Sequence, residues 1–216
     1  MYGKNMYNYN KSQREMQWLK GRENMNRRWT FQQYRTIDLV LFAVMLCISE
    51  TVIVTAARFW FPEQLYTVSV VAALTTIVLM RWGPWAAIHA FAGGFVFCTV
   101  SHGTAQQYII YCIGNLFSML SLLLIRWLGK ERIRSDSTLT VLFALCTLLL
   151  MQLGRALIAL VLGTEPARCV GFVTTDVLSG LFTAVIVWIA RRLDGIFEDQ
   201  KHYLLRVNRE EEKGGF

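Results

Sequence analysis

The chain has 216 residues, of which 54% are hydrophobic and 17% are charged, and its formal net charge is +7. The charges gather in the two end segments and in one loop, so the long apolar stretches indicate an integral membrane protein and exclude a soluble globular domain. Because Lys and Arg flank those stretches, the positive charge is explained by membrane orientation and does not indicate nucleic-acid binding.

Residues 1–36 form a basic arm rich in Asn, Tyr and Gln, which we expect to lie in the cytoplasm. The arm is either a solvated tail with interfacial aromatic residues or a short helix lying on the inner membrane surface. It is polar for too long to hold the apolar core of a secretory signal. We therefore expect the first span to act as an uncleaved signal anchor.

Six apolar windows follow, each of roughly the length that a transmembrane helix needs. The sequence predicts an all-α membrane domain over residues 37–193, with spans at 37–60, 65–81, 84–101, 106–128, 138–162 and 170–193. Residues 194–216 form a charged tail. Of the 22 Lys and Arg residues, 19 fall on the side of the two termini, so both termini are expected in the cytoplasm and the protein in the plasma membrane.

Small residues recur on one face of several of these spans. The third span carries Ala86, Ala90 and Gly94 at intervals of four, and the first carries Ala43 and Cys47. Such a face lets another helix approach closely, whether that helix belongs to the same chain or to a partner. The spacing does not separate these two interpretations.

Five polar side chains lie inside the spans, between roughly 9 and 16 Å from the outer end at about 1.5 Å per helical residue. They are Glu50, Asn115, Gln152, Arg155 and Asp176. A guanidinium at that depth requires water, a ligand or an opposite charge, so we predict that Arg155 pairs with Glu50 or Asp176. The layer is either a solute cavity open to the outside or an internal ion-pair network. His89, nearer the inner end, is expected to be a packed side chain.

Counting Arg58 at the outer end of the first span with this layer makes its charge zero, which favours a neutral or zwitterionic ligand over a polyanion. The chain has no serine–histidine pair, zinc motif or phosphate-binding loop at the spacing that enzymes require. Its three His residues are dispersed. We therefore expect no enzymatic activity, no metal and no cofactor, and any ATP hydrolysis must come from separate subunits.

Three segments of residues 37–193 have a recognisable pattern. They are the third-span entry Arg81-Trp82-Gly83-Pro84 with the small residues behind it, Arg155-Ala156-Leu157-Ile158-Ala159-Leu160, and the last span from Asp176-Val177-Leu178-Ser179-Gly180 to Arg191-Arg192. In these segments the chain resembles the substrate-binding S component of energy-coupling factor (ECF) vitamin transporters.

The resemblance implies a membrane-embedded protein that captures a small, vitamin-like nutrient from outside for ATP-driven uptake. Its implied partners are a transmembrane coupling subunit and ATPase subunits. In the family an Ala-x-x-x-Ala pair on the first helix contacts the coupling subunit, and the matching positions here are Ala43 and Cys47. Two alternatives remain, namely a structural or assembly membrane protein and a small secondary transporter.

Overall fold

The computed structural model describes residues 31–60, 68–193 and 196–197. Most of the basic arm, the first outer connection at 61–67 and most of the charged tail lie outside the described residues. The chain divides into two compact units, one ending at Ile37 and one beginning at Asp38. The second unit holds every candidate site residue.

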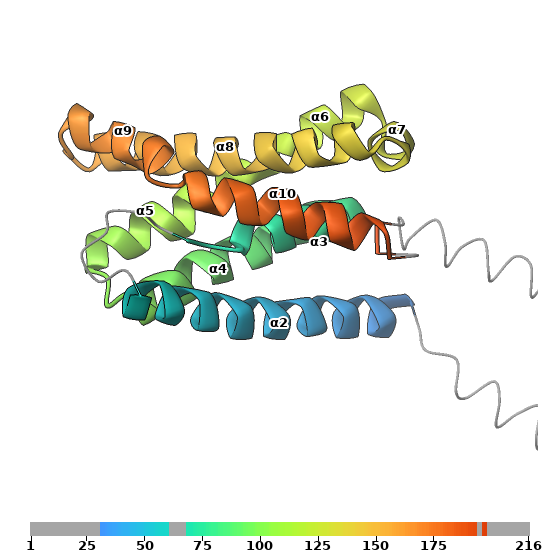
Figure 1. Cartoon of the computed structure of the whole chain (residues 1–216), viewed down its shortest axis with the longest axis horizontal. Helices are drawn as coiled ribbons and strands as arrows, with labels where there is room; N and C mark the ends of the chain where they lie inside the picture. Colours follow the sequence, from blue (N-terminus) through green and yellow to red (C-terminus); the bar gives the residue numbers. More distant parts are fainter. Residues whose placement is uncertain (1–30, 61–67, 194–195, 198–216) are drawn as a thin grey trace, which may run out of the picture. The chain divides into compact units, whose positions relative to one another are not determined.

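The described residues are helical and contain no strand, which confirms the all-α prediction (Figure 1). The helices are α2 (Phe31–Trp60), α3 (Val71–Trp82), α4 (Ala86–Val100), α5 (Ala105–Asn115), α6 (Ser121–Leu128), α7 (Lys130–Ser135), α8 (Ser137–Val161), α9 (Pro166–Thr174) and α10 (Val177–Arg191). Short 3₁₀ turns at Gly83–Trp85 and Leu116–Leu120 join α3 to α4 and α5 to α6.

Five helical stretches of this fold are long and apolar enough to cross a membrane. They are Gln32–Trp60, Val71–Val100, Ala105–Leu128, Ser137–Val161 and Pro166–Arg191. The second of them turns back on itself, because the start of α3 packs against Gly93 in α4. It therefore covers most of the second and third predicted spans, and each of the six predicted spans includes helix in the structure.

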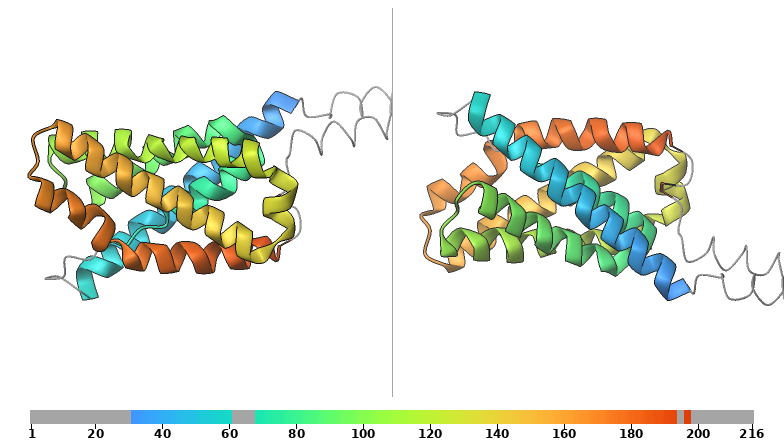
Figure 2. Two further views of the ribbon diagram at one scale, coloured as in Figure 1. Left: turned by 90° about the horizontal axis from the view of Figure 1, so that it is seen from above. Right: turned by 90° about the horizontal axis from the view of Figure 1, so that it is seen from below.

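Hydrogen bonds between helices define their directions. Antiparallel pairing of α4 with α5 follows from the bond between Asn115 and the Ala90 carbonyl and from the packing of Gly94 on Tyr111. Helices α5–α6 and α8 are antiparallel as well, since Ser121 bonds Thr147 near one end while Gly114 packs on Arg155 further along. Helix α2 crosses the other helices obliquely (Figure 2).

The second predicted span is shorter than expected. Helix α3 begins at Val71 and has 12 residues, about 18 Å of rise against a hydrocarbon core of about 30 Å. Residues 68–70 before it are buried and non-helical. Every residue of α3 is buried, so this short helix lies at the centre of the bundle and begins part of the way across it.

The last predicted span is also interrupted. Helix α9 ends at Thr174, and α10 begins at Val177 with Asp176 as its N-cap residue. The two non-helical segments, 68–70 and 175–176, lie side by side, because the backbone N–H of Ser69 donates to the hydroxyl of Ser179 at 2.9 Å. Irregular backbone at membrane depth requires protein partners for its polar groups, and here Ser179 of α10 and Glu50 of α2 accept from the N–H groups of Ser69 and Val70.

An ion pair and several hydrogen bonds from arginine side chains hold one end of the bundle together. The Arg81 guanidinium bonds both oxygens of Asp38 at 2.9 Å and also donates to the Ile196 carbonyl at 3.1 Å. At the same end, Arg191 donates to the Arg134 and Ser135 carbonyls of α7 at 3.1 and 2.5 Å. The basic loop around α7 therefore lies at the end of the bundle where α2 enters and α10 ends.

Candidate functional site: a buried polar layer

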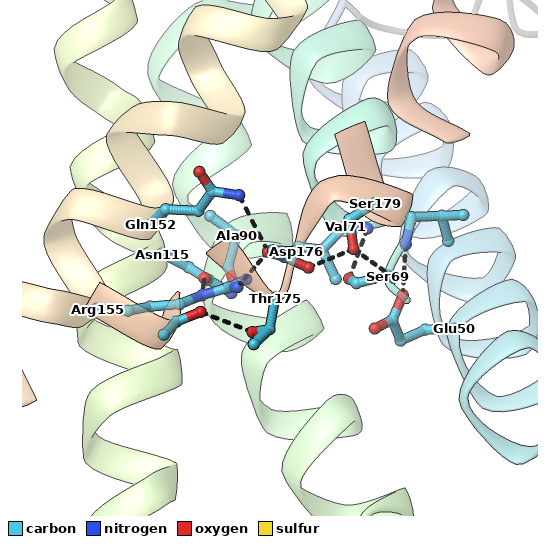
Figure 3. A network of polar contacts seen from close by, with 12 residues as sticks. Glu50, Ser69, Val71, Ala90, Asn115, Gln152, Arg155, Thr175, Asp176 and Ser179 are labelled. Atoms are coloured by element: carbon cyan, nitrogen blue, oxygen red, sulfur yellow. Dashed lines mark hydrogen bonds and ion pairs between the residues drawn. The ribbon is translucent and has the colours of Figure 1, made fainter. Parts of the chain in front are cut away.

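Arg155, on α8, is the centre of the buried polar layer (Figure 3). Its Nη1 lies 3.1 Å from Oδ2 of Asp176, and its Nε donates to Oδ1 of Asn115 at 2.8 Å. Arg155 is 4% exposed and Asp176 is 2% exposed. One of the two predicted pairings, that of Arg155 with Asp176, is thus confirmed, and the pair places a positive charge in the interior with its counter-charge.

Asn115 fixes the position of that guanidinium from the other side. Its Nδ2 donates to the Ala90 carbonyl of α4 at 3.0 Å, so both ends of the amide are used. The ring of Tyr111, one turn earlier on α5, lies 4.7 Å from the Arg155 guanidinium and stacks on Phe97. These contacts give Arg155 a single orientation, with an amide at its edge and a ring against its face.

The two oxygens of Asp176 have different partners. Oδ2 accepts from Arg155 and, at 3.4 Å, from the amide of Gln152, which lies one turn before Arg155 on the same face of α8. Oδ1 accepts from the hydroxyl of Ser179, at the first turn of α10. Asp176 therefore links α8 to the break between α9 and α10.

Glu50 extends the layer to α2 and α3. Its Oε2 accepts from the backbone N–H of Val70 at 2.9 Å, and the Ser69 hydroxyl accepts from the N–H of Val71 at 3.2 Å. These are backbone donors at the start of α3, where no preceding helical turn supplies acceptors. The Glu50 carboxyl group and the Ser69 side chain replace those acceptors, which explains how α3 begins inside the bundle.

Two glycines explain why Asn115 and Arg155 meet. A Cβ at Gly114 would lie 2.7 Å from the Cα of Arg155, and a Cβ at Gly154 would collide with the Gly114 carbonyl and with Phe117. Only residues without a side chain allow α5 and α8 to approach this closely. Each glycine immediately precedes a residue of the polar layer, so the contact sets the distance between the two side chains.

The structure brings all five predicted site residues into one network. Asn115, Gln152, Arg155 and Asp176 are bonded directly, while Glu50 is linked to them through residues 69–71 and Ser179. Sequence reasoning missed Ser69 and Ser179 as members of the layer. Ser179 follows Asp176 by three residues, a spacing that brings the two side chains together at the start of a helix and could have been recognised, whereas Ser69 has no distinguishing signal.

Other predicted residues lie apart from the layer. Arg58 donates to the Val100 carbonyl at the far end of α2, so it does not contribute to the charge of the layer, and the predicted charge balance was wrong in counting it. His89 is buried, with Nε2 3.0 Å from the Leu39 carbonyl, as a packed histidine. Ala43 and Cys47 are half-buried and border the exposed face of α2.

The small-residue face of the third span packs inside the chain. Ala86, Ala90 and Gly94 are buried, and a Cβ at Gly94 would lie 2.7 Å from the Tyr111 carbonyl oxygen of α5. Of the two interpretations open for this face, packing against a helix of the same chain is the one observed.

The layer offers donors and acceptors, not a metal site. Among the described residues no group of three or more His, Cys, Asp and Glu side chains could hold a metal ion. Oε1 of Glu50 has no hydrogen-bond partner in the described part of the chain, although the side chain is 0% exposed. With both carboxyl groups and Arg155 ionised, the layer carries one net negative charge.

The fold and this layer define the class: an all-α protein whose helices are long and apolar enough for a multi-pass membrane protein, with ionisable residues buried among them. Comparison of the chain with family models, with curated proteins and with solved structures found no match. The function of the protein is therefore inferred from its residues and their arrangement.

Proposed function

We propose that this chain is a membrane-embedded solute-binding protein that captures a small nutrient from the outer side of the membrane. One observation carries the proposal, which is that the start of α3 and the break between α9 and α10 both lie at a layer of buried ionisable side chains. Discontinuous helices near the middle of the membrane are typical of solute sites in transport proteins, because their ends present backbone groups to a ligand. Intramembrane ionisable residues favour the same function.

The composition of the layer suggests the size and kind of solute. Asn115, Gln152, Arg155 and Glu50 offer amide, guanidinium and carboxyl groups within one layer, and the ring of Tyr111 adds a flat apolar surface. Sites with a few convergent polar groups and aromatic walls suit compact heterocycles. A vitamin-like molecule fits this chemistry better than a long polymer or a lipid chain does.

Release of the solute inside the cell requires energy that this chain has no motif to supply. We propose that it works as the S component of an ECF-type transporter, coupled to a transmembrane partner and to ATPase subunits. The resemblance of residues 81–94, 155–160 and 176–192 supports this assignment. The half-buried pair Ala43 and Cys47, which borders an exposed apolar face of α2, supports a docking position for the partner helix.

Two measurements test the binding function. Native mass spectrometry of the protein purified in mild detergent is expected to show a small molecule that remains bound, since carriers with high affinity retain their solute. Isothermal titration with the identified molecule is then expected to give one site per chain. A protein that retains nothing and binds no compound of a vitamin panel would instead favour the structural or assembly function.

A further inference from the structure

Glu50 is a buried acid whose hydrogen-bonding capacity is only half used. Oε2 accepts from Val70, but Oε1 has no partner among the described residues. An unpartnered polar atom in the interior is unfavourable, more so when it is charged, so such an atom calls for an explanation. Helix α3 needs one oxygen of this side chain and leaves the other available.

The second acid of the layer is different. Both oxygens of Asp176 are bonded, and the carboxyl group is paired with Arg155 at 3.1 Å. Asp176 is therefore the counter-charge of Arg155 and joins the helices around it. Glu50 is not needed for that pair, and in its ionised form it is the group whose charge the layer leaves uncompensated.

We propose that Glu50 recognises a cationic nitrogen of the solute, either a protonated amine or a positively charged ring nitrogen with an N–H. This inference rests on the proposed solute-binding function and specifies the class of solute. An ionised carboxyl group only accepts hydrogen bonds, so its free oxygen requires a donor. A cationic donor forms the stronger, charge-assisted bond and also cancels the net negative charge of the layer.

An inorganic cation would also neutralise the Glu50 carboxylate, but the residues around Glu50 suit it less well. Metal cations such as Ca²⁺ require about six oxygen ligands, whereas Glu50 offers one free oxygen, and the described residues contain no cluster of metal-ligating side chains. A nitrogen cation needs only one or two acceptors from the protein. The structure therefore favours an organic cation over a metal ion.

The test uses the full chain in detergent and three sets of small nutrients sorted by charge. The cationic set is pyridoxamine, ethanolamine and putrescine, each with a protonated amine, the neutral set is riboflavin, nicotinamide and pyridoxine, and the anionic set is biotin, pantothenate and nicotinate. Pyridoxamine and pyridoxine form a matched pair that differs only in an ammonium or a hydroxyl group. NaCl and KCl are compared separately, and thermal unfolding and calorimetric titration are measured.

At least one cationic compound is expected to raise the melting temperature of the parent protein, and its affinity is expected to fall tenfold or more in Glu50→Gln. Glutamine keeps an acceptor for the Val70 N–H, so this variant preserves the start of α3. Glu165→Gln, which makes the same charge change at an exposed outer position, is the matched control and should bind like the parent. If Glu50→Gln does not fold, binding of the three charge-sorted sets to the parent protein still shows whether the solute is cationic.

The inference is overturned if only neutral or anionic compounds bind, if Na⁺ or K⁺ alone produces the stabilisation, or if Glu50→Gln binds the cationic compound as the parent does. The first and third of these results leave the solute-binding function standing. If no compound of any set binds and no solute is retained on purification, both proposals fail together.

Discussion

At the scale of single residues, the layer shows how a membrane protein keeps an arginine in its interior. The guanidinium of Arg155 has a carboxylate at one nitrogen, an amide oxygen at another and an aromatic ring against its face. Removing one partner of a buried charge costs far more than the pair contributes, because the remaining charge is left in a medium of low polarity. The partners of Arg155 are therefore as important to the layer as the arginine.

Asn115→Ala tests the role of the amide in this arrangement. The change leaves Arg155 Nε without its acceptor and the Ala90 carbonyl without its donor, so the guanidinium loses its fixed orientation. We expect the affinity for the solute identified by native mass spectrometry to fall about tenfold or more, since a lost buried hydrogen bond is worth about 1 to 3 kcal/mol. Calorimetric titration measures the effect.

The control for this prediction is His89→Ala, because His89 bonds a backbone carbonyl of α2 and is not a member of the layer. Its affinity for the same solute should be close to that of the parent, measured at a temperature at which both proteins are folded. Loss of binding in His89→Ala, together with normal binding in Asn115→Ala and Arg155→Gln, would mean that the solute site lies elsewhere.

At the scale of helices, the contact between α5 and α8 depends on Gly114 and Gly154. Their backbones approach so closely that a Cβ at either position would overlap the opposite helix. A helix cannot shift to make room without moving the polar side chain next to the glycine. Close backbone packing and the position of the polar groups are therefore a single structural feature.

Gly154→Ala is expected to destabilise the protein by about 1 to 3 kcal/mol, the typical range for overpacking a tight interior, because its Cβ meets the Gly114 carbonyl and Phe117. Thermal unfolding in detergent should show a lower melting temperature. Gly171→Ala in α9 is the matched control, since a Cβ there meets nothing within 4 Å. Equal melting temperatures for the two variants would contradict the proposed tight contact.

The sequence predicted the helices and the polar layer more successfully than it predicted their interruptions. A constant rise per residue places polar side chains by depth, so Gln152, Arg155 and Asp176 could be assigned to one layer without coordinates. The breaks before Val71 and at Thr175 could not be predicted, because neither follows a glycine or proline. They depend on side-chain partners from other helices. The role of Gly114 and Gly154 in helix packing likewise becomes visible only when the positions of α5 and α8 are known.

At the scale of the whole molecule, the distribution of charge predicts its orientation in the membrane. Arg81, Arg134 and Arg191 lie at one end of the second unit, together with the exposed Arg126 and Arg132. Basic residues in short loops favour the cytoplasmic side. We therefore expect this end to face the cytoplasm and the connection between α8 and α9 to face outward.

Cysteine labelling in intact cells measures this orientation. Ser135→Cys and Ala167→Cys, both at exposed positions, are compared in a background in which the partly exposed Cys47 and Cys146 are replaced. A maleimide that does not cross membranes should label the cysteine at position 167 and leave the one at 135 unlabelled until the cells are opened. The reverse pattern would show that the orientation is inverted.

Docking of a coupling partner is tested on α2. Ala43→Leu combined with Cys47→Leu enlarges two half-buried positions next to an exposed apolar face. We expect the double variant to lose solute uptake in cells that contain the transport machinery, while the purified protein keeps its solute affinity. Ile48→Leu, on the exposed part of the same helix, should leave both unchanged. Loss of affinity together with uptake would show that these positions pack internally.

The close contact between α5 and α8 has a mechanical consequence. Two backbones in such close contact leave little room for one helix to slide along the other, so we expect Asn115 and Arg155 to form a fixed side of the layer. The stretch of α2 and that of α9–α10 are different, because only 28% and 22% of their apolar windows are buried, against 44% for α8. We therefore expect any movement that lets a solute reach the layer to come from α2 or from α9–α10, and not from the contact between α5 and α8.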